Sequence, residues 1–189
     1  MRPFAAASMI ALGALALVRA LRRRYFRVEV AGDSMRPTLL PGEYLLLSRA
    51  VPSAGRLGAG AIVLLQDATG RPILKRVVGL PGESLRVGTA VFVNRRRLAE
   101  PYAIGESPLA QHRGVNRLGE DEYFLIGDNR EASTDSRDFG AVRHERIEGV
   151  VRFRYWPPRR VGPIGAPHRE LGQAEASGEL PLGMIPPRN

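Results

Sequence analysis

The sequence contains no cysteine, which excludes disulfide bonds, thiolate metal sites and cysteine nucleophiles. Histidine is also scarce: three residues stand far apart in the chain, so a histidine-rich metal site is not expected. Aromatic residues make up only 6% of the 189 residues, which is few for a protein that stacks on nucleic-acid bases. The sequence therefore predicts no metal and no other cofactor.

Lysine is almost absent: of the 28 basic residues, 27 are arginine and one is Lys75. Arginine stays protonated in proteins, whereas a buried lysine can lose its proton because its pKa shifts readily. A chain that uses arginine nearly everywhere and keeps one lysine is consistent with a need for a deprotonable amine. The alternative is a compositional bias with one chance lysine, and the count alone does not decide between them.

One long apolar run stands at the N-terminus, over residues Pro3–Val18. As a helix these 16 residues would span roughly 24 Å, and an extension to Leu21 would bring the length to about 28 Å, close to a bilayer core. Arginines follow directly at positions 19 and 22–24, where a cleavage site would need small residues. We expect an uncleaved single-span anchor, with a cleavable signal peptide as the alternative. The arginine flank would place the C-terminal side in the cytoplasm.

The rest of the chain has the pattern of short strands separated by glycine and proline. This pattern predicts a mainly β domain, either a sandwich or a partly closed barrel. We divide the chain into an anchor with its basic flank (1–26), a β-rich domain (27–157) with an irregular polar insertion (about 94–120), and a Pro/Gly-rich disordered tail (158–189). The expected strands are Arg27–Val30, Tyr44–Leu47, Ala61–Leu65, Ile73–Val78, Leu85–Val87, Val91–Val93, Tyr123–Ile126 and Val150–Tyr155.

Three segments combine tight turns with reactive side chains. The first is GDSMRPTL, which begins at Gly32 and carries the hydroxyl of Ser34 after a strand. The second is LKRVVGLPGE, which places the ammonium of Lys75 inside a β-branched strand. The third is GDNREASTDSRDFG over residues 127–140, a polar loop that opens and closes with glycine. Taken singly, each could be a turn, a half-exposed strand or a solvated loop.

Together, in this order and spacing, the three segments resemble the sequence boxes of the serine–lysine signal peptidases, the type I family of membrane-bound leader peptidases. The phrases YFLIGDN and YWP, at 123–129 and 155–157, also fit that family, and the resemblance covers roughly residues 31–157. It implies that Ser34 is the nucleophile and Lys75 the general base. No histidine lies within a box, so the residues give little support to a Ser-His-Asp triad and leave a Ser-Lys dyad.

The resemblance also implies supporting roles. Ser133 would orient the Lys75 amine, and the backbone N–H of Ser34 would form the oxyanion hole. Some members carry a serine at the position of Gly32, so this chain is not expected to have a side-chain oxyanion donor there. The scaffold of ion pairs would comprise Asp128, Arg130, Asp135 and Arg137, with Arg76 as a further member.

The activity implied is removal of signal peptides from exported preproteins by cleavage after small residues in an Ala-x-Ala-like pattern. The enzyme would be bound to the cell membrane by a single span, dock on anionic phospholipid and work on the extracytoplasmic side, against the charge rule noted above. One alternative is a narrow-specificity maturation peptidase of the same clan. The other is a membrane-tethered basic binding protein, but the arginine clusters at 22–24 and 95–97 are short and no nucleic-acid partner is expected.

Overall fold

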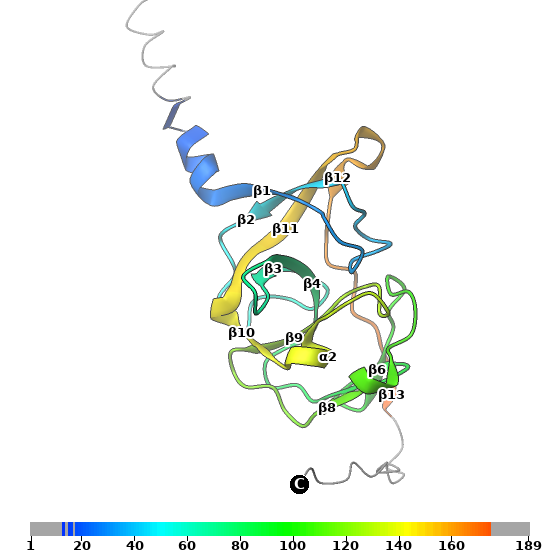
Figure 1. Ribbon diagram of the computed structural model, residues 1–189. Coiled ribbons are helices and arrows are strands. Elements are labelled where there is room, and N and C mark those ends of the chain that lie inside the picture. Colours follow the sequence, from blue (N-terminus) through cyan, green and yellow to red (C-terminus); the bar gives the residue numbers. More distant parts are fainter. Residues whose placement is uncertain (1–12, 14, 17, 175–189) are drawn as a thin grey trace, which may run out of the picture.

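The computed structural model describes residues 13, 15–16 and 18–174, which form two β-sheets below a helical segment that includes residues 18–24 (Figure 1). The prediction of a mainly β domain is confirmed. The eight-stranded sheet has the order β1-β2-β11-β3-β4-β9-β10, and β12 pairs with β11 outside that path. Its strands are β1 (Tyr25–Glu29), β2 (Tyr44–Ser48), β3 (Ile62–Gln66), β4 (Pro72–Gly79), β9 (Glu122–Ile126), β10 (Val142–Arg143), β11 (Ile147–Trp156) and β12 (Gly162–Pro163).

Alternating side chains of the large sheet form two apolar clusters on its opposite faces. On β3, Ile62 and Leu64 belong to one cluster, while Val63 and Leu65 belong to the other. Successive strand residues point to opposite faces, so each of these apolar runs serves both clusters. Strand β4 lies between β3 and β9 and is held on both sides, which makes it a rigid support for the residues that it carries.

The second sheet has five strands in the order β13-β7-β6-β5-β8. The insertion expected to be irregular contributes two short strands of this sheet, β7 and β8. The β6–β7 turn has positive φ at Asn94 and Arg95, so the hairpin lacks the glycine that usually marks such a turn. The strands are β5 (Leu85–Val87), β6 (Val91–Val93), β7 (Arg96–Leu98), β8 (Arg113–Val115) and β13 (Leu171–Ala174), and a 3-10 turn (Leu109–Gln111) precedes β8.

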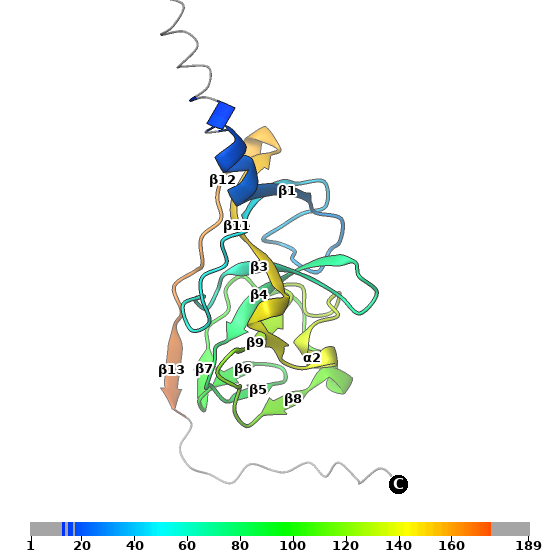
Figure 2. The ribbon, with the colours of Figure 1, turned by 90° about the vertical axis from the view of Figure 1, so that its left-hand side faces the viewer.

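The segment expected to be a disordered tail is ordered over residues 158–174, so the prediction is wrong for that part. A 3-10 turn (Pro158–Arg160) leads into β12, and the chain then runs along the flank of the molecule to β13 at the edge of the small sheet (Figure 2). Proline and glycine are compatible with edge strands, because a missing N–H or side chain costs little there. Residues 175–189 lie outside the described part.

The predicted anchor falls largely on residues 1–12, 14 and 17, which are outside the described part of the chain. Within residues 13, 15–16 and 18–174, no helix has both the length and the apolar character needed to cross a membrane.

Candidate active site

The Ser34 segment lies in a turn that follows β1 and is anchored by its apolar residues. Met35 and Leu39 are buried in the core, and the N–H of Leu39 donates to the Met35 carbonyl at 2.8 Å. Ser34 itself is half-buried, so its hydroxyl is held near the protein body without being sealed from solvent. Gly32 is exposed, and a side chain added there would meet nothing within 4 Å.

Lys75 lies on β4 on the face that also carries Ile73 and Val77 and is paired across the ladder with Val63. Its side chain is buried, and all three neighbours belong to one apolar cluster or pack against it. Desolvation lowers the pKa of Lys75 to about 8, and Arg137 lowers it further, whereas Asp135, Asp138 and Asp128 oppose the shift. Among the described residues, the amine forms no hydrogen bond or ion pair with a protein group. An amine in this setting is prepared to lose its proton near neutral pH.

Gly127 brings the two segments together. Strands β4 and β9 are antiparallel with Arg76 opposite Ile126, so continuing the register by one residue puts Gly127 opposite Lys75. A Cβ on Gly127 would collide with the Ser133 hydroxyl and would lie 2.6 Å from the Ser34 carbonyl oxygen. Directly opposed residues project to the same side of a ladder, so Lys75, Ser133 and the Ser34 turn meet over the face of Gly127 where a side chain is missing.

Backbone hydrogen bonds hold the Ser34 turn against the polar loop that follows Gly127. The N–H of Asn129 donates to the Ser34 carbonyl at 3.0 Å, and its side-chain Nδ2 donates to the Asp33 carbonyl at 3.3 Å. The position of Ser34 therefore depends on the 127–129 backbone as well as on its own buried neighbours.

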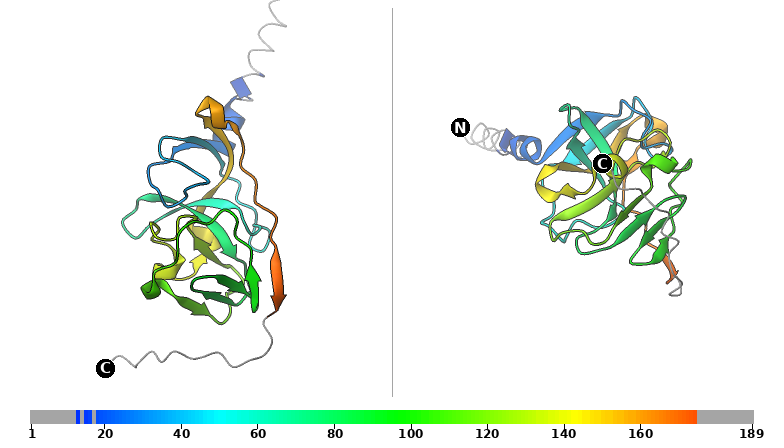
Figure 3. Two further views of the ribbon diagram at one scale, coloured as in Figure 1. Left: turned by 90° about the vertical axis from the view of Figure 1, so that its right-hand side faces the viewer. Right: turned by 60° about the horizontal axis from the view of Figure 1, so that its bottom comes forward.

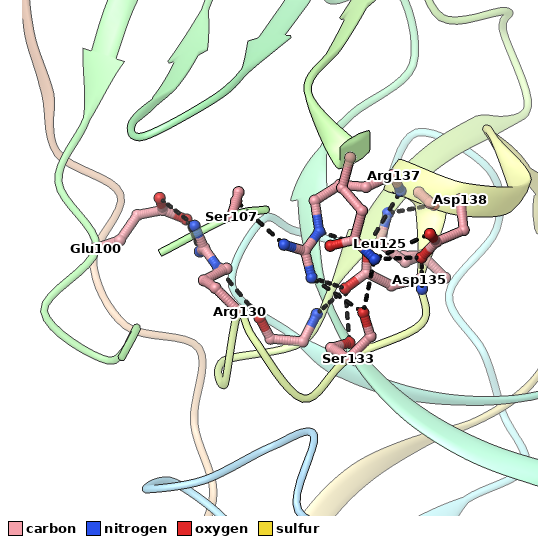
Figure 4. Close-up of polar contacts among 11 residues, drawn as sticks. Glu100, Ser107, Leu125, Arg130, Ser133, Asp135, Arg137 and Asp138 are labelled. Atoms are coloured by element: carbon pink, nitrogen blue, oxygen red, sulfur yellow. Dashed lines mark hydrogen bonds and ion pairs between the residues drawn. The ribbon is translucent and has the colours of Figure 1, made fainter. Parts of the chain in front are cut away.

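Asp135 holds the other side of that loop and is fully buried. Its carboxylate accepts hydrogen bonds from the Gly127 N–H at 2.9 Å, the Ser133 hydroxyl at 2.6 Å and the Arg137 guanidinium at 2.8 Å (Figure 4). Burial raises the pKa of Asp135, but these bonds outweigh it and hold the pKa below its usual range. Asp135 also caps the single-turn helix α2 (Ser136–Phe139).

Ser133 therefore contacts a different residue from the one expected. The expected hydrogen bond between Ser133 and Lys75 is not found among the described residues, and the hydroxyl donates to Asp135 instead. The Ser133 hydroxyl donates to Asp135 because an ionised carboxylate is a strong acceptor, whereas an ammonium is a donor only.

Arg137 and Arg130 extend the network on either side of Asp135. Arg137 is completely buried and donates to the Ser107 hydroxyl at 3.1 Å as well as to Asp135. Arg130 donates to the Gly127 carbonyl at 3.1 Å and forms an ion pair with Glu100 at 2.6 Å (Figure 4). Burial lowers the pKa of Arg130, but the bonds to Glu100 outweigh it, so the net pKa is raised.

Arg76, the neighbour of Lys75, contacts four residues from different parts of the chain. Its guanidinium donates to both carboxylate oxygens of Asp128 at 2.7 and 2.6 Å, and to the Gly60 carbonyl at 2.7 Å. It also reaches the Thr38 hydroxyl at 3.2 Å, and the Tyr102 ring lies 4.1 Å from its central carbon. One arginine thus ties β4 to the Ser34 turn through Thr38 and to the polar loop through Asp128.

Several partners in this network were not anticipated from the sequence. They share a position in loops or in the insertion, where no periodic pattern pointed to them, and their partners are 16 or more residues away. They are Thr38, Gly60, Glu100, Tyr102 and Ser107.

Comparison with known proteins gives a consistent result. Residues 1–156 match the family described as signal peptidase, peptidase S26. The chain is 34% identical over 157 residues to signal peptidase I T of Bacillus subtilis (strain 168), covering 76% of this chain and 81% of the relative. Signal peptidase IB of Staphylococcus aureus (strain COL) is 31% identical over 146 residues, covering 68% of this chain and 76% of the relative.

A solved structure of a signal peptidase I from Enterococcus faecalis V583 aligns with 28% identity and a TM-score of 0.43, over 52% of this chain and 98% of that chain. The family match extends over the three boxes and over every strand of the two sheets except β12 and β13. The chain therefore belongs to the signal peptidase family, peptidase S26, and is an enzyme of the signal peptidase I type.

Proposed function

We propose that this protein is a membrane-bound serine endopeptidase that removes signal peptides from exported preproteins, with Ser34 as nucleophile and Lys75 as general base. The observation that carries the proposal is the position of Gly127. It stands opposite Lys75 in the ladder, and the space that its missing side chain leaves is bordered by Ser133 and the Ser34 turn. The relatives named signal peptidase I supply the substrate class.

In the proposed reaction, the neutral Lys75 amine takes the proton of the Ser34 hydroxyl as Oγ attacks the scissile carbonyl. The resulting ammonium gives a proton to the departing amine as the tetrahedral intermediate collapses to an acyl-enzyme. The departing amine is the new N-terminus of the mature protein, which leaves at this step. A water molecule then attacks the ester and gives a proton to Lys75, which passes it to Ser34 Oγ as the signal peptide leaves with a new C-terminal carboxylate. With a pKa of about 8, about one amine in ten is neutral at pH 7, which is sufficient for a base that recycles each turnover.

Ser133 acts in this scheme by stabilising the ammonium form of Lys75. Because the Ser133 hydroxyl donates its hydrogen to Asp135, the lone pairs of its oxygen are free to accept a hydrogen bond from the ammonium. The charge of Asp135 is in turn balanced by Arg137, so the network offers an acceptor without adding a free anion beside the base.

The backbone N–H of Ser34 is the proposed oxyanion donor. Gly32 has open space around its Cβ position and an ordinary φ, so a serine is expected to fit there. We predict that Gly32→Ser folds normally and changes kcat by no more than about threefold, upwards if the added hydroxyl reaches the oxyanion. A folded, inactive Gly32→Ser enzyme would contradict the open geometry at this position.

The proposed location is the cell membrane, with residues 3–21 as the single span and the β domain on the extracytoplasmic side. The arginines at 22–24 would then dock on phospholipid headgroups. Thr89→Cys adds the chain's sole thiol at an exposed turn, so a membrane-impermeant maleimide tests the orientation. Labelling in intact cells supports an extracytoplasmic domain, and labelling only after lysis contradicts it.

The test of the activity uses a peptide with alanine at the first and third positions before the cut. Ser34→Ala is expected to abolish cleavage while leaving the thermal midpoint unchanged, since only a hydroxyl is lost. Ser53→Ala, at an exposed turn, is the matched control and should retain full activity. More than a small residual turnover in purified Ser34→Ala would overturn the assignment. A panel of unrelated preproteins separates a general signal peptidase from a narrow-specificity maturation enzyme.

A further inference from the structure

The ordered segment after the family-matched region, residues 157–174, spans the molecule from one sheet to the other; we call it the C-terminal strap. It begins beside β11, where Gly162 and Pro163 pair with Arg154 and Phe153, and ends as β13 on the edge of the small sheet. Two views show it running down one side of the molecule (Figures 2 and 3). Ile164 packs against the core of the large sheet and Leu171 against the core that includes the small sheet, so both ends are anchored by apolar contacts.

The first polar contact of the strap is with the turn that carries Ser34. Arg160 donates to the carbonyls of Pro37 at 3.3 Å and Thr38 at 3.1 Å. It also forms an ion pair with Glu43 at 3.0 Å, and the Glu43 side chain is only 3% exposed. Arg154 of β11 shares the Thr38 carbonyl and the Glu43 carboxylate. The backbone three and four residues after Ser34 is therefore held from the strap side.

The second contact is with the strand that carries Lys75. Arg169 donates to the Val78 carbonyl at 3.0 Å and forms an ion pair with Glu83 at 2.7 Å. Val78 is the third residue after Lys75 on β4, so this bond holds the strand near its C-terminal end.

The strap also packs closely on Gly60. A Cβ on Gly60 would lie 2.9 Å from the Pro167 ring and 3.2 Å from the Ala166 side chain. The Gly60 carbonyl accepts the hydrogen bond from Arg76, which pairs with Asp128. A chain of direct contacts thus runs from the strap through Gly60 to the residue next to Lys75.

We propose that the C-terminal strap is a brace that holds the Ser34 turn and the Lys75 strand in mutual register, with Arg160 and Arg169 as positioning residues for peptide hydrolysis. The inference rests on the proposed Ser34–Lys75 reaction. A proton transfer between two groups on separate elements is sensitive to small displacements, since a shift of about 1 Å can cost a factor of about 100 in rate. Neither arginine touches Ser34 or Lys75 directly, so each acts through the backbone that it holds.

The test compares Arg160→Ala and Arg169→Ala with Arg159→Ala in the full chain. Arg159 is the exposed neighbour of Arg160, and the structure shows no polar contact of its side chain with a described residue. Cleavage of the alanine peptide is measured well below the thermal midpoint of every variant. Each brace variant is expected to lower kcat about tenfold or more with KM within about twofold, while Arg159→Ala stays within about twofold on both. Arg169→Lys should recover part of the loss, because an ammonium can still pair with Glu83.

Folded brace variants with kcat within twofold of the wild type would overturn the proposal and leave the strap a purely structural element. If an alanine variant fails to fold, Arg160→Lys decides: it keeps the charge but cannot reach two carbonyls and Glu43 together, so an unchanged kcat again overturns the brace. The proposed function fails in a different way, namely when the wild type does not cleave the peptide or Ser34→Ala still does, and the brace then falls with it. The brace alone is refuted if the wild type cleaves the peptide, Ser34→Ala does not, and the Arg160 and Arg169 variants cleave it with the kcat of the wild type.

Discussion

Lys75 and Arg76 are neighbours on β4, both basic and both only 2% exposed, yet the protein treats them in opposite ways. Adjacent residues of a strand project to opposite faces, so Lys75 and Arg76 have different neighbours, and loops bring polar groups only to Arg76. The Arg76 guanidinium has a carboxylate, a carbonyl and a hydroxyl as acceptors and an aromatic ring beside it. The Lys75 amine has apolar neighbours and no bonded partner among the described residues.

The difference shows how one strand can supply both stability and reactivity. A buried cation with a paired anion stays charged and ties its surroundings together, whereas a buried amine without one is pushed towards its neutral form. Only lysine can respond in this way, because a guanidinium does not lose its proton in a protein. The restriction of lysine to one position is thus explained if that position carries the base.

The largest effect is expected from making the two positions alike. Lys75→Arg keeps the charge but removes the proton acceptor, so we predict a loss of about 10³–10⁴-fold in kcat/KM on the alanine peptide. Thermal unfolding serves as the control for folding, since the larger side chain overpacks the apolar face and costs about 1–3 kcal/mol. Cleavage within tenfold of the wild type by a folded Lys75→Arg enzyme would exclude a general-base role.

Removing the paired cation tests the other half of the comparison. Arg76→Met leaves Asp128 buried without its counter-ion, and we expect the free energy of unfolding to fall by about 3–5 kcal/mol. Denaturant unfolding of the purified protein measures the change. Adding Asp128→Leu should recover part of that loss because the orphaned charge is gone, and a double variant no better than the single one would count against a charge-pairing role.

The same substitution at the neighbouring position should have the opposite sign. Folding lowers the pKa of Lys75 from 10.5 to about 8, so the unfolded chain binds the proton more tightly and this group lowers stability at neutral pH. Lys75→Met should therefore raise the free energy of unfolding by up to about 3 kcal/mol at pH 7. The advantage should shrink as the pH rises above 8 and vanish above 10.5. A pH-independent difference would mean that packing, not the amine charge, is responsible.

A smaller shift is expected from the exposed acid near Lys75. The charge of Asp138 raises the pKa of Lys75, so Asp138→Asn should move the acidic limb of the kcat/KM profile to slightly lower pH. Because Asp138 is exposed, high salt should bring the wild-type and variant profiles together. A shift to higher pH would contradict this electrostatic role.

Many of the strands could be predicted from local sequence patterns. Short apolar and β-branched runs between glycines and prolines predicted the main strands to within a few residues, with the Leu85–Val87 and Val91–Val93 hairpin at its observed bounds. These features are local: a strand needs only its own alternation, and a hairpin only its turn and two flanks. The box residues were recognised in another way, through the resemblance of three short segments, taken together, to the signal peptidase family.

The residues that pair with the site side chains could not be predicted from local patterns. Glu100 pairs with Arg130 across 30 residues, and Arg160 reaches Thr38 across 122, through loops that carry no periodic pattern. The strap was mistaken for a disordered tail because its prolines and glycines resemble those of unstructured segments.

The sequence by itself determined which residues could do chemistry: a lone lysine in a β-branched strand, a serine in a tight turn, and a polar loop closed by glycines. Only the tertiary structure decided which of them meet and which side chains hold them. Pairing of β4 with β9 set Gly127 opposite Lys75, burial lowered the pKa of the amine, and Asp135 accepted the hydrogen bond of the Ser133 hydroxyl. Desolvation and hydrogen-bond geometry depend on groups brought together from distant parts of the chain, and no local pattern encodes them.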